Sequence, residues 1–174
     1  LLASLACNFP GVGAPATPEP VVVSSQAAAE LQQNVQSAAA TAMSGGPVSL
    51  VITEGQLTSL AALELQNLQE PRIEEVQILL RDGLINVSGK VNQGGFSAEM
   101  QLALSVSIGA DGLPKTKAES ASLGPIPIPD ALLDQLTNEI DELLASQLAQ
   151  NGQRMVVESL TIADGVMAIS GKLQ

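Results

Sequence analysis

Residues 82–90 read DGLINVSGK and residues 164–172 read DGVMAISGK, so one nine-residue pattern occurs twice at an offset of 82. Five of the nine positions are identical, including the Asp-Gly pair that opens each copy. Asp-Gly between two apolar runs is typical of a two-residue β-hairpin turn, which needs positive φ at both central residues. The apolar runs at 73–80 and 155–162 therefore predict a strand, a tight turn and a returning strand at both places.

Each predicted hairpin is preceded by a helical pattern. In the stretch 53–68, Thr53 and Gln56 have the spacing of a capping box, in which side chains and backbone N–H groups pair reciprocally at a helix start. In the stretch 130–148, apolar residues recur three or four positions apart, as on one face of an α-helix. We therefore expect one helix before each hairpin.

A glycine interrupts the apolar face of each returning strand, at Gly89 and Gly171. A glycine inside a strand often marks a bend or the close approach of another backbone. Helix, hairpin and glycine recur in the same order, which predicts a duplicated helix–hairpin unit at 53–91 and 130–173.

Residues 96–108, FSAEMQLALSVSI, alternate between apolar and polar side chains over thirteen positions. Ordinary strands have about 5–6 residues, whereas thirteen residues at about 3.3 Å each would span about 43 Å. The apolar face of this strand needs cover, and the helix at 130–148, about 30 Å long at 1.5 Å per residue, is expected to provide it. The next segment, 113–123, is polar, and Lys115 and Lys117 are typical of an edge strand.

The segments before the first hairpin unit are weaker in pattern. An Ala-rich helix is predicted within 21–43; it either packs loosely at the periphery of the domain or belongs to a stalk. A short strand is predicted at 48–53. Together these patterns predict an α+β fold in which long amphipathic helices pack on an antiparallel sheet.

Composition excludes several classes of function. The chain has 174 residues and a net charge of −11, and a chain this acidic lacks the basic face that nucleic acid requires. It has no histidine and one cysteine, so Ser–His and Cys–His pairs and cysteine zinc sites are ruled out. Asp134, Asp141 and Glu142 lie between apolar helix positions and are expected on its solvated face. We therefore expect no enzyme, no cofactor and no metal site.

The chain opens LLASLACNFPGVGAPATPEP, in which the small residue Ala6 precedes Cys7 and an irregular Pro/Gly-rich segment follows. This arrangement resembles the end of a bacterial lipoprotein signal, whose lipobox cysteine carries the lipid. The alternative is an ordinary buried free cysteine. The first interpretation predicts an extracytoplasmic protein anchored through Cys7 to the bacterial membrane. It divides the chain into a signal remnant with the lipobox cysteine (1–7), a linker (8–20) and a single domain (21–174).

Four stretches carry a resemblance to a known family: ITEGQLTSL (52–60), VQILLRDGLINVSGKV (76–91), GPIPIPDALLDQL (124–136) and VESLTIADGVMAISGKL (157–173). Over about residues 48–174 the chain resembles the LmeA-like phospholipid-binding proteins of bacterial envelopes, within the tubular lipid-binding (TULIP) superfamily. The resemblance implies a TULIP-like half-barrel, in which a long helix is wrapped by a strongly curved antiparallel sheet and acyl chains lie between them. It brings no catalytic residues.

A lipid or another hydrophobic ligand is accordingly expected between the helix at 130–148 and the long strand. The aliphatic composition, with only 1% aromatic residues, suits acyl chains better than a small polar ligand. The alternative is a structural or assembly lipoprotein whose core is filled. The residues expected to line the ligand site are Phe96, Met100, Leu102, Leu104, Val106, Ile108, Leu136, Ile140 and Leu144.

Overall fold

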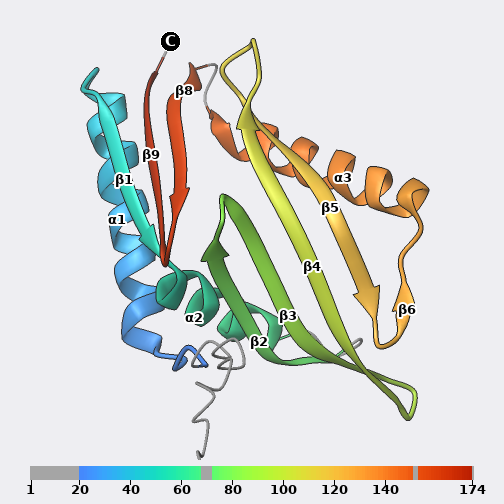
Figure 1. Ribbon diagram of the computed structural model, residues 1–174. Helices are drawn as coiled ribbons and strands as arrows, with labels where there is room; N and C mark the ends of the chain where they lie inside the picture. The colour runs from blue at the N-terminus through green and yellow to red at the C-terminus, as the bar shows by residue number, and fades with distance from the viewer. Residues whose placement is uncertain (1–19, 68–71, 151–152, 174) are drawn as a thin grey trace, which may run out of the picture.

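The computed structural model describes residues 20–67, 72–150 and 153–173, apart from the side chains at 136, 143–145, 147–150, 153–155 and 173. Within these ranges three helices and two antiparallel sheets form an α+β fold (Figure 1). The helices are α1 (Ser25–Met43), α2 (Glu54–Leu65) and α3 (Asp130–Leu148). The α+β class and the antiparallel pairing are confirmed, but the strands form two sheets, and not the single sheet predicted from the sequence.

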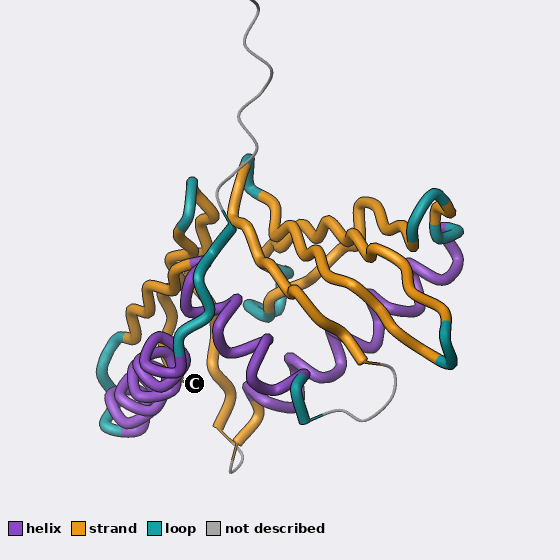
Figure 2. Tube along the Cα trace, turned by 90° about the horizontal axis from the view of Figure 1, so that it is seen from below, coloured by secondary structure: helices purple, strands orange, loops and turns teal. Residues whose placement is uncertain are grey.

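The four-stranded sheet has the order β1-β9-β8-β7, and the five-stranded sheet has the order β2-β3-β4-β5-β6. The strands are β1 (Val48–Thr53), β2 (Arg72–Arg81), β3 (Leu84–Gln93), β4 (Phe96–Ile108), β5 (Pro114–Leu123), β6 (Ile126–Pro127), β7 (Ala149–Gln150), β8 (Gln153–Ala163) and β9 (Val166–Leu173). The thirteen-residue strand predicted at 96–108 is β4, with the predicted bounds. Figure 2 shows helical segments, drawn purple, below the arched strands, drawn orange.

Both Asp-Gly pairs lie in tight turns between antiparallel strands, as predicted. Asp82 and Gly83 join β2 to β3, and both have positive φ. Asp164 and Gly165 join β8 to β9, but of these two only Gly165 has positive φ. Both copies of the nine-residue pattern therefore form β-hairpins, although their turns differ in backbone conformation.

Each strand glycine of the repeat faces a β-bulge in its neighbour. Gly89 lies opposite the register shift at 74–77 of β2, and Gly171 lies beside the shift at 157–159 of β8. A Cβ at Gly89 would lie 3.3 Å from a backbone oxygen of the bulged strand, and one at Gly171 would meet the backbone oxygen of Val156 more closely. The glycines thus mark close backbone approach, as predicted, at bulges that increase the local twist.

The helices of the two proposed units are docked differently. α2 packs against β2, the first strand of its own hairpin, whereas α3 packs against β5. Each copy thus contains a hairpin with a register shift beside its glycine, and the superposition of whole helix–hairpin units stays a prediction.

Two apolar clusters form the core, and Ile85 of β3 packs against both. The first joins α1, β1, β2 and β9 through Leu31, Ile52, Leu80 and Met167. The second joins β4, β5 and α3 through Leu104, Ala118, Ala121 and Leu133.

The Ala-rich helix is part of this core. Leu31 of α1 is 3% exposed and belongs to the first cluster, and Ala28 and Ala42 are buried as well. α1 packs against both α2 and β1. One face of α1 therefore packs on the domain, which contradicts a stalk helix, while most of its other residues are exposed at the periphery.

Candidate ligand-binding site

The middle of β4 meets α3 as expected. Leu104 is 9% exposed and packs with Leu133 of α3 and with two alanines of β5. Leu102 and Ile140 pack against this cluster. The structure thus brings together three residues of the predicted ligand site: Leu102, Leu104 and Ile140.

The apolar side chains of β4 become more exposed toward both ends of the strand. Met100 and Val106 are half-buried, whereas Phe96 is 56% exposed and Ile108 is 36% exposed. Phe96 and Ile108, both predicted to line the ligand site, are therefore more exposed than Leu102 and Leu104, and their part in binding stays a prediction. The reason is one of length, because a thirteen-residue strand of about 43 Å extends past a nineteen-residue helix of about 30 Å.

An apolar strip runs along the same face of the sheet away from the second cluster. Cross-strand partners point to the same face, so the register of β3, β4 and β5 places these side chains side by side. The members of the strip are all half-buried: Val87, Val91, Ala98, Met100 and Leu123. It ends at two exposed side chains on the same face, Phe96 and Ile126, of which Ile126 is 63% exposed. The strip is therefore partly accessible from this end of the sheet.

Three predicted site residues cannot be placed at this strip. Leu136 and Leu144 belong to α3, but their side chains lie outside the described part of the structure. The predicted lipid-attachment residue, Cys7, lies outside the described residues as well.

Polar side chains fasten α3 to the outer edge of β5. The Asp141 carboxylate accepts hydrogen bonds from the backbone N–H and the hydroxyl of Thr116, both at 2.8 Å. One turn earlier, the Thr137 hydroxyl accepts from the Ala118 N–H at 3.0 Å. Lys115 lies 3.8 Å from the same carboxylate of Asp141. Asp141 was expected on the solvated face of the helix; instead it caps the strand edge, because that face lies against β5.

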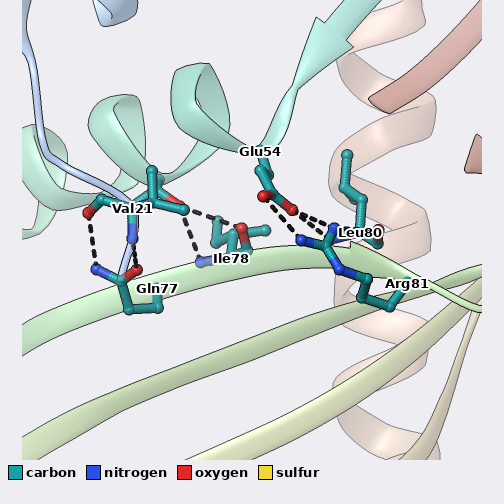
Figure 3. A network of polar contacts seen from close by, with 7 residues as sticks. Val21, Glu54, Gln77, Ile78, Leu80 and Arg81 are labelled. Carbon is teal, nitrogen blue, oxygen red and sulfur yellow. Dashed lines mark hydrogen bonds and ion pairs between the residues drawn. The ribbon is translucent and has the colours of Figure 1, made fainter. Parts of the chain in front are cut away.

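The opposite edge of the five-stranded sheet is closed in the same way by α2 (Figure 3). The Thr58 hydroxyl accepts from the Ile78 N–H at 2.9 Å and donates to the Ile78 carbonyl at 3.2 Å. The Glu54 carboxylate accepts from the Leu80 N–H at 3.2 Å. The spacing fits because four helix residues rise about 6 Å, close to the roughly 6.6–6.8 Å of two strand residues. Both edges are thus protected from pairing with another strand.

Glu54 also joins the two sheets. Its carboxylate pairs with both terminal nitrogens of Arg81, at 2.6 and 3.0 Å. Its backbone N–H donates to the Gly165 carbonyl at 3.0 Å, and the Gly165 N–H donates to the Leu80 carbonyl at 2.9 Å. The hydrogen bond from Arg81 holds the pKa of Glu54 below its ordinary value against the opposing effect of burial. The same hydrogen bond raises the pKa of Arg81.

The first described residues are tied to α2 and β2. The side-chain amide of Gln77 accepts from the Val21 N–H at 2.6 Å and donates to the Val21 carbonyl at 3.1 Å, as a backbone strand would (Figure 3). The Ser24 N–H donates to the Ser59 hydroxyl at 3.0 Å. Val21 and Ser24 are therefore fixed against β2 and α2.

Two hollows are present in the described part of the structure, one at the Phe96 end of the apolar strip and one away from it. One of about 260 Å³ lies at the β3–β4 turn beside Arg72, Asn92 and Phe96. The other, of about 510 Å³, lies between α1 and β1.

Among the described residues, no group of three acidic or cysteine side chains is placed to hold a metal ion. In the same part of the chain, every buried side-chain nitrogen and oxygen has a hydrogen-bond partner. No protein-family model matches this chain, and no curated protein sequence matches it.

Proposed function

We propose that this protein binds lipid or another ligand with an acyl chain on the apolar strip of the five-stranded sheet. The observation that carries the proposal is the row of half-buried aliphatic side chains that ends at exposed Phe96 and Ile126. An acyl chain has no polar groups to satisfy, so an aliphatic strip suffices to bind it, at roughly 0.8 kcal/mol per buried methylene.

The proposed setting is the bacterial envelope. Cys7 would carry the lipid anchor, and the Pro-rich linker at 8–20 would hold the domain away from the bilayer surface. In the described part of the chain, no helix is both long and apolar enough to cross a membrane. The proposal includes an LmeA-like, TULIP-like half-barrel built from the duplicated helix–hairpin unit. Support for it comes from the paired Asp-Gly hairpins with matching bulges.

A structural or assembly role for the same envelope lipoprotein is the second candidate. It is favoured by the second core cluster, in which Leu104, Ala118 and Leu133 are each less than 10% exposed. If this packing continues along α3, the strip is ordinary core and no ligand enters.

The absence of tryptophan and tyrosine from the chain allows a direct test. Phe96→Trp places a single fluorophore at the open end of the strip, and Ser97→Trp places one on the opposite face of the same strand. A brominated fatty acid, which quenches tryptophan at short range, is expected to quench the first variant saturably and to leave the second nearly unchanged. Equal quenching of both variants, or of neither, would contradict binding at the strip.

A second variant separates the two candidates. Met100→Trp fills the middle of the strip, with Gln101→Trp on the exposed opposite face as its control. If the strip binds an acyl chain, Met100→Trp abolishes fatty-acid binding and changes the melting temperature little. If the core is filled, the wild type does not bind, and overpacking costs about 1–3 kcal/mol.

A further inference from the structure

β1 has an outer edge that pairs with no other strand of its sheet, because β1 pairs with β9 on one side only. The hydrogen bond from the Glu54 N–H to the Gly165 carbonyl continues this ladder. Since backbone groups alternate in direction along a strand, the even-numbered residues of β1 face β9. The N–H and carbonyl groups of Ser49, Val51 and Thr53 therefore point outward.

This edge differs from the two edges of the five-stranded sheet. There, helix side chains at i and i+4 occupy the outward backbone groups of β2 and β5. At β1 the Thr53 N–H is taken by Gln56, but in the described part of the chain nothing outside the sheet bonds the outward groups of Ser49 or Val51. Val51 is 54% exposed. β1, VSLVIT, also contains no lysine, no charge and no proline to discourage strand addition.

The surface around this edge is uncharged in an acidic protein. The chain carries a net charge of −11, yet residues 25–53 contain a single charged residue, Glu30. Two copies can therefore approach through this surface with little like-charge repulsion. A partner selected by its own positive charge would find little to bind here, so the surface suits a second copy of the chain.

The groove of about 510 Å³ lies along the same edge. Asn34, Ser37 and Thr41 of α1 line one side, and β1 lines the other. These side chains are polar and uncharged, so they can bond an incoming backbone without introducing an unpaired charge. The groove offers space beside β1 for one further strand.

We propose that two copies of this chain associate through β1, antiparallel and about a two-fold axis at Leu50, to join their four-stranded sheets. In this register Ser49 of each copy pairs with Val51 of the other, and the four outward groups of each copy are satisfied. A register centred on Ser49 would set Val51 against Pro47, which has no N–H. A register centred on Val51 would use the Thr53 N–H, which Gln56 already occupies. The interface is isologous and closed, so association stops at two copies.

Cysteine cross-linking tests the register in the full chain carrying Cys7→Ser. Across the axis, the two Leu50 residues form a non-hydrogen-bonded pair with Cα atoms about 4.5 Å apart, within disulfide range. The two Val51 residues are diagonal neighbours about 7–8 Å apart, too far for a disulfide. Mild oxidation is expected to give a covalent dimer of Leu50→Cys but not of Val51→Cys. Equal cross-linking of both variants, or of neither when melting of the reduced proteins shows them folded, would overturn the proposal.

Sedimentation tests association without new cysteines. We expect a concentration-dependent dimer of the wild type, which Val51→Lys weakens at least about tenfold because a charged edge opposes strand pairing. Val22→Lys, at a position 85% exposed outside β1, is the matched control and should leave the dimer unchanged. A wild type that stays monomeric at the highest attainable concentration would overturn the proposal and leave the edge to some other extended strand.

Discussion

Replacing Thr58 by valine tests whether helix side chains stabilise the sheet edges. Thr58 is 0% exposed, and its hydroxyl bonds both the N–H and the carbonyl of Ile78. Valine keeps the shape of threonine but leaves both backbone groups without a partner. Each unsatisfied buried group costs about 1–3 kcal/mol, and two groups are affected. The added methyl group offsets part of this cost, so we expect the free energy of unfolding to decrease by about 2–4 kcal/mol. In a chain of this size a loss of 1 kcal/mol lowers the melting temperature by about 2–4 °C, so the melting temperature should decrease by about 4–16 °C.

The matched control is Thr137→Val at the opposite edge. It removes one hydrogen bond, from the Ala118 N–H, and should cost about half as much, roughly 1–2 kcal/mol. Thermal and urea unfolding followed by circular dichroism measure the stability, and amide hydrogen exchange reports Ile78 and Ala118 separately. If Thr58→Val is as stable as the wild type and the Ile78 amide exchanges no faster, the edge does not depend on the cap and the reasoning is refuted.

Two further predictions concern the junction and the bulges. The pKa of Glu54 is lower in the folded protein than in the unfolded chain. Its stabilising effect is therefore complete above the unfolded pKa and is lost as the pH falls through the folded pKa. Glu54→Gln should therefore reduce the free energy of unfolding by about 1–2 kcal/mol at neutral pH, and urea unfolding should show the difference shrinking in acid; a pH-independent difference would contradict the ion-pair explanation. Gly171→Ala should destabilise by about 1–3 kcal/mol, because the new methyl group meets the Val156 backbone oxygen. Gly89→Ala, whose nearest contact is 3.3 Å, should cost less, and equal shifts in melting temperature would argue against the close approach at Gly171.

The sequence was sufficient wherever neighbours along the chain determine the structure. The Asp-Gly turns, the capping box of Thr53 and Gln56 and the thirteen-residue strand are all present as predicted. A turn or a cap involves residues two to four positions apart, and period-two alternation is a property of the strand itself. These signals are therefore readable without knowledge of the fold.

The candidate site could be predicted only in part. Alternation identified the apolar face of β4 and the helical stripe of α3, so Leu102, Leu104 and Ile140 were correctly placed together. Alternation does not show how much of the apolar face of β4 is covered by α3. That depends on the relative lengths and positions of the strand and the helix. For that reason nothing in the sequence indicated that Phe96, one of the residues expected to line the ligand site, is exposed at the end of the strip.

Only the tertiary structure decided which strands pair and which helix side chains bond the edges of the sheets. The pairing of β1 with β9 joins segments more than a hundred residues apart and divides the strands between two sheets. Thr58 and Asp141 give no sign in the sequence that they cap strand edges, because a polar residue on a helix looks the same whether water or a backbone lies beside it. Hydrophobic periodicity specifies a face, whereas the hydrogen-bonding partner of an edge depends on which element the completed fold brings alongside it.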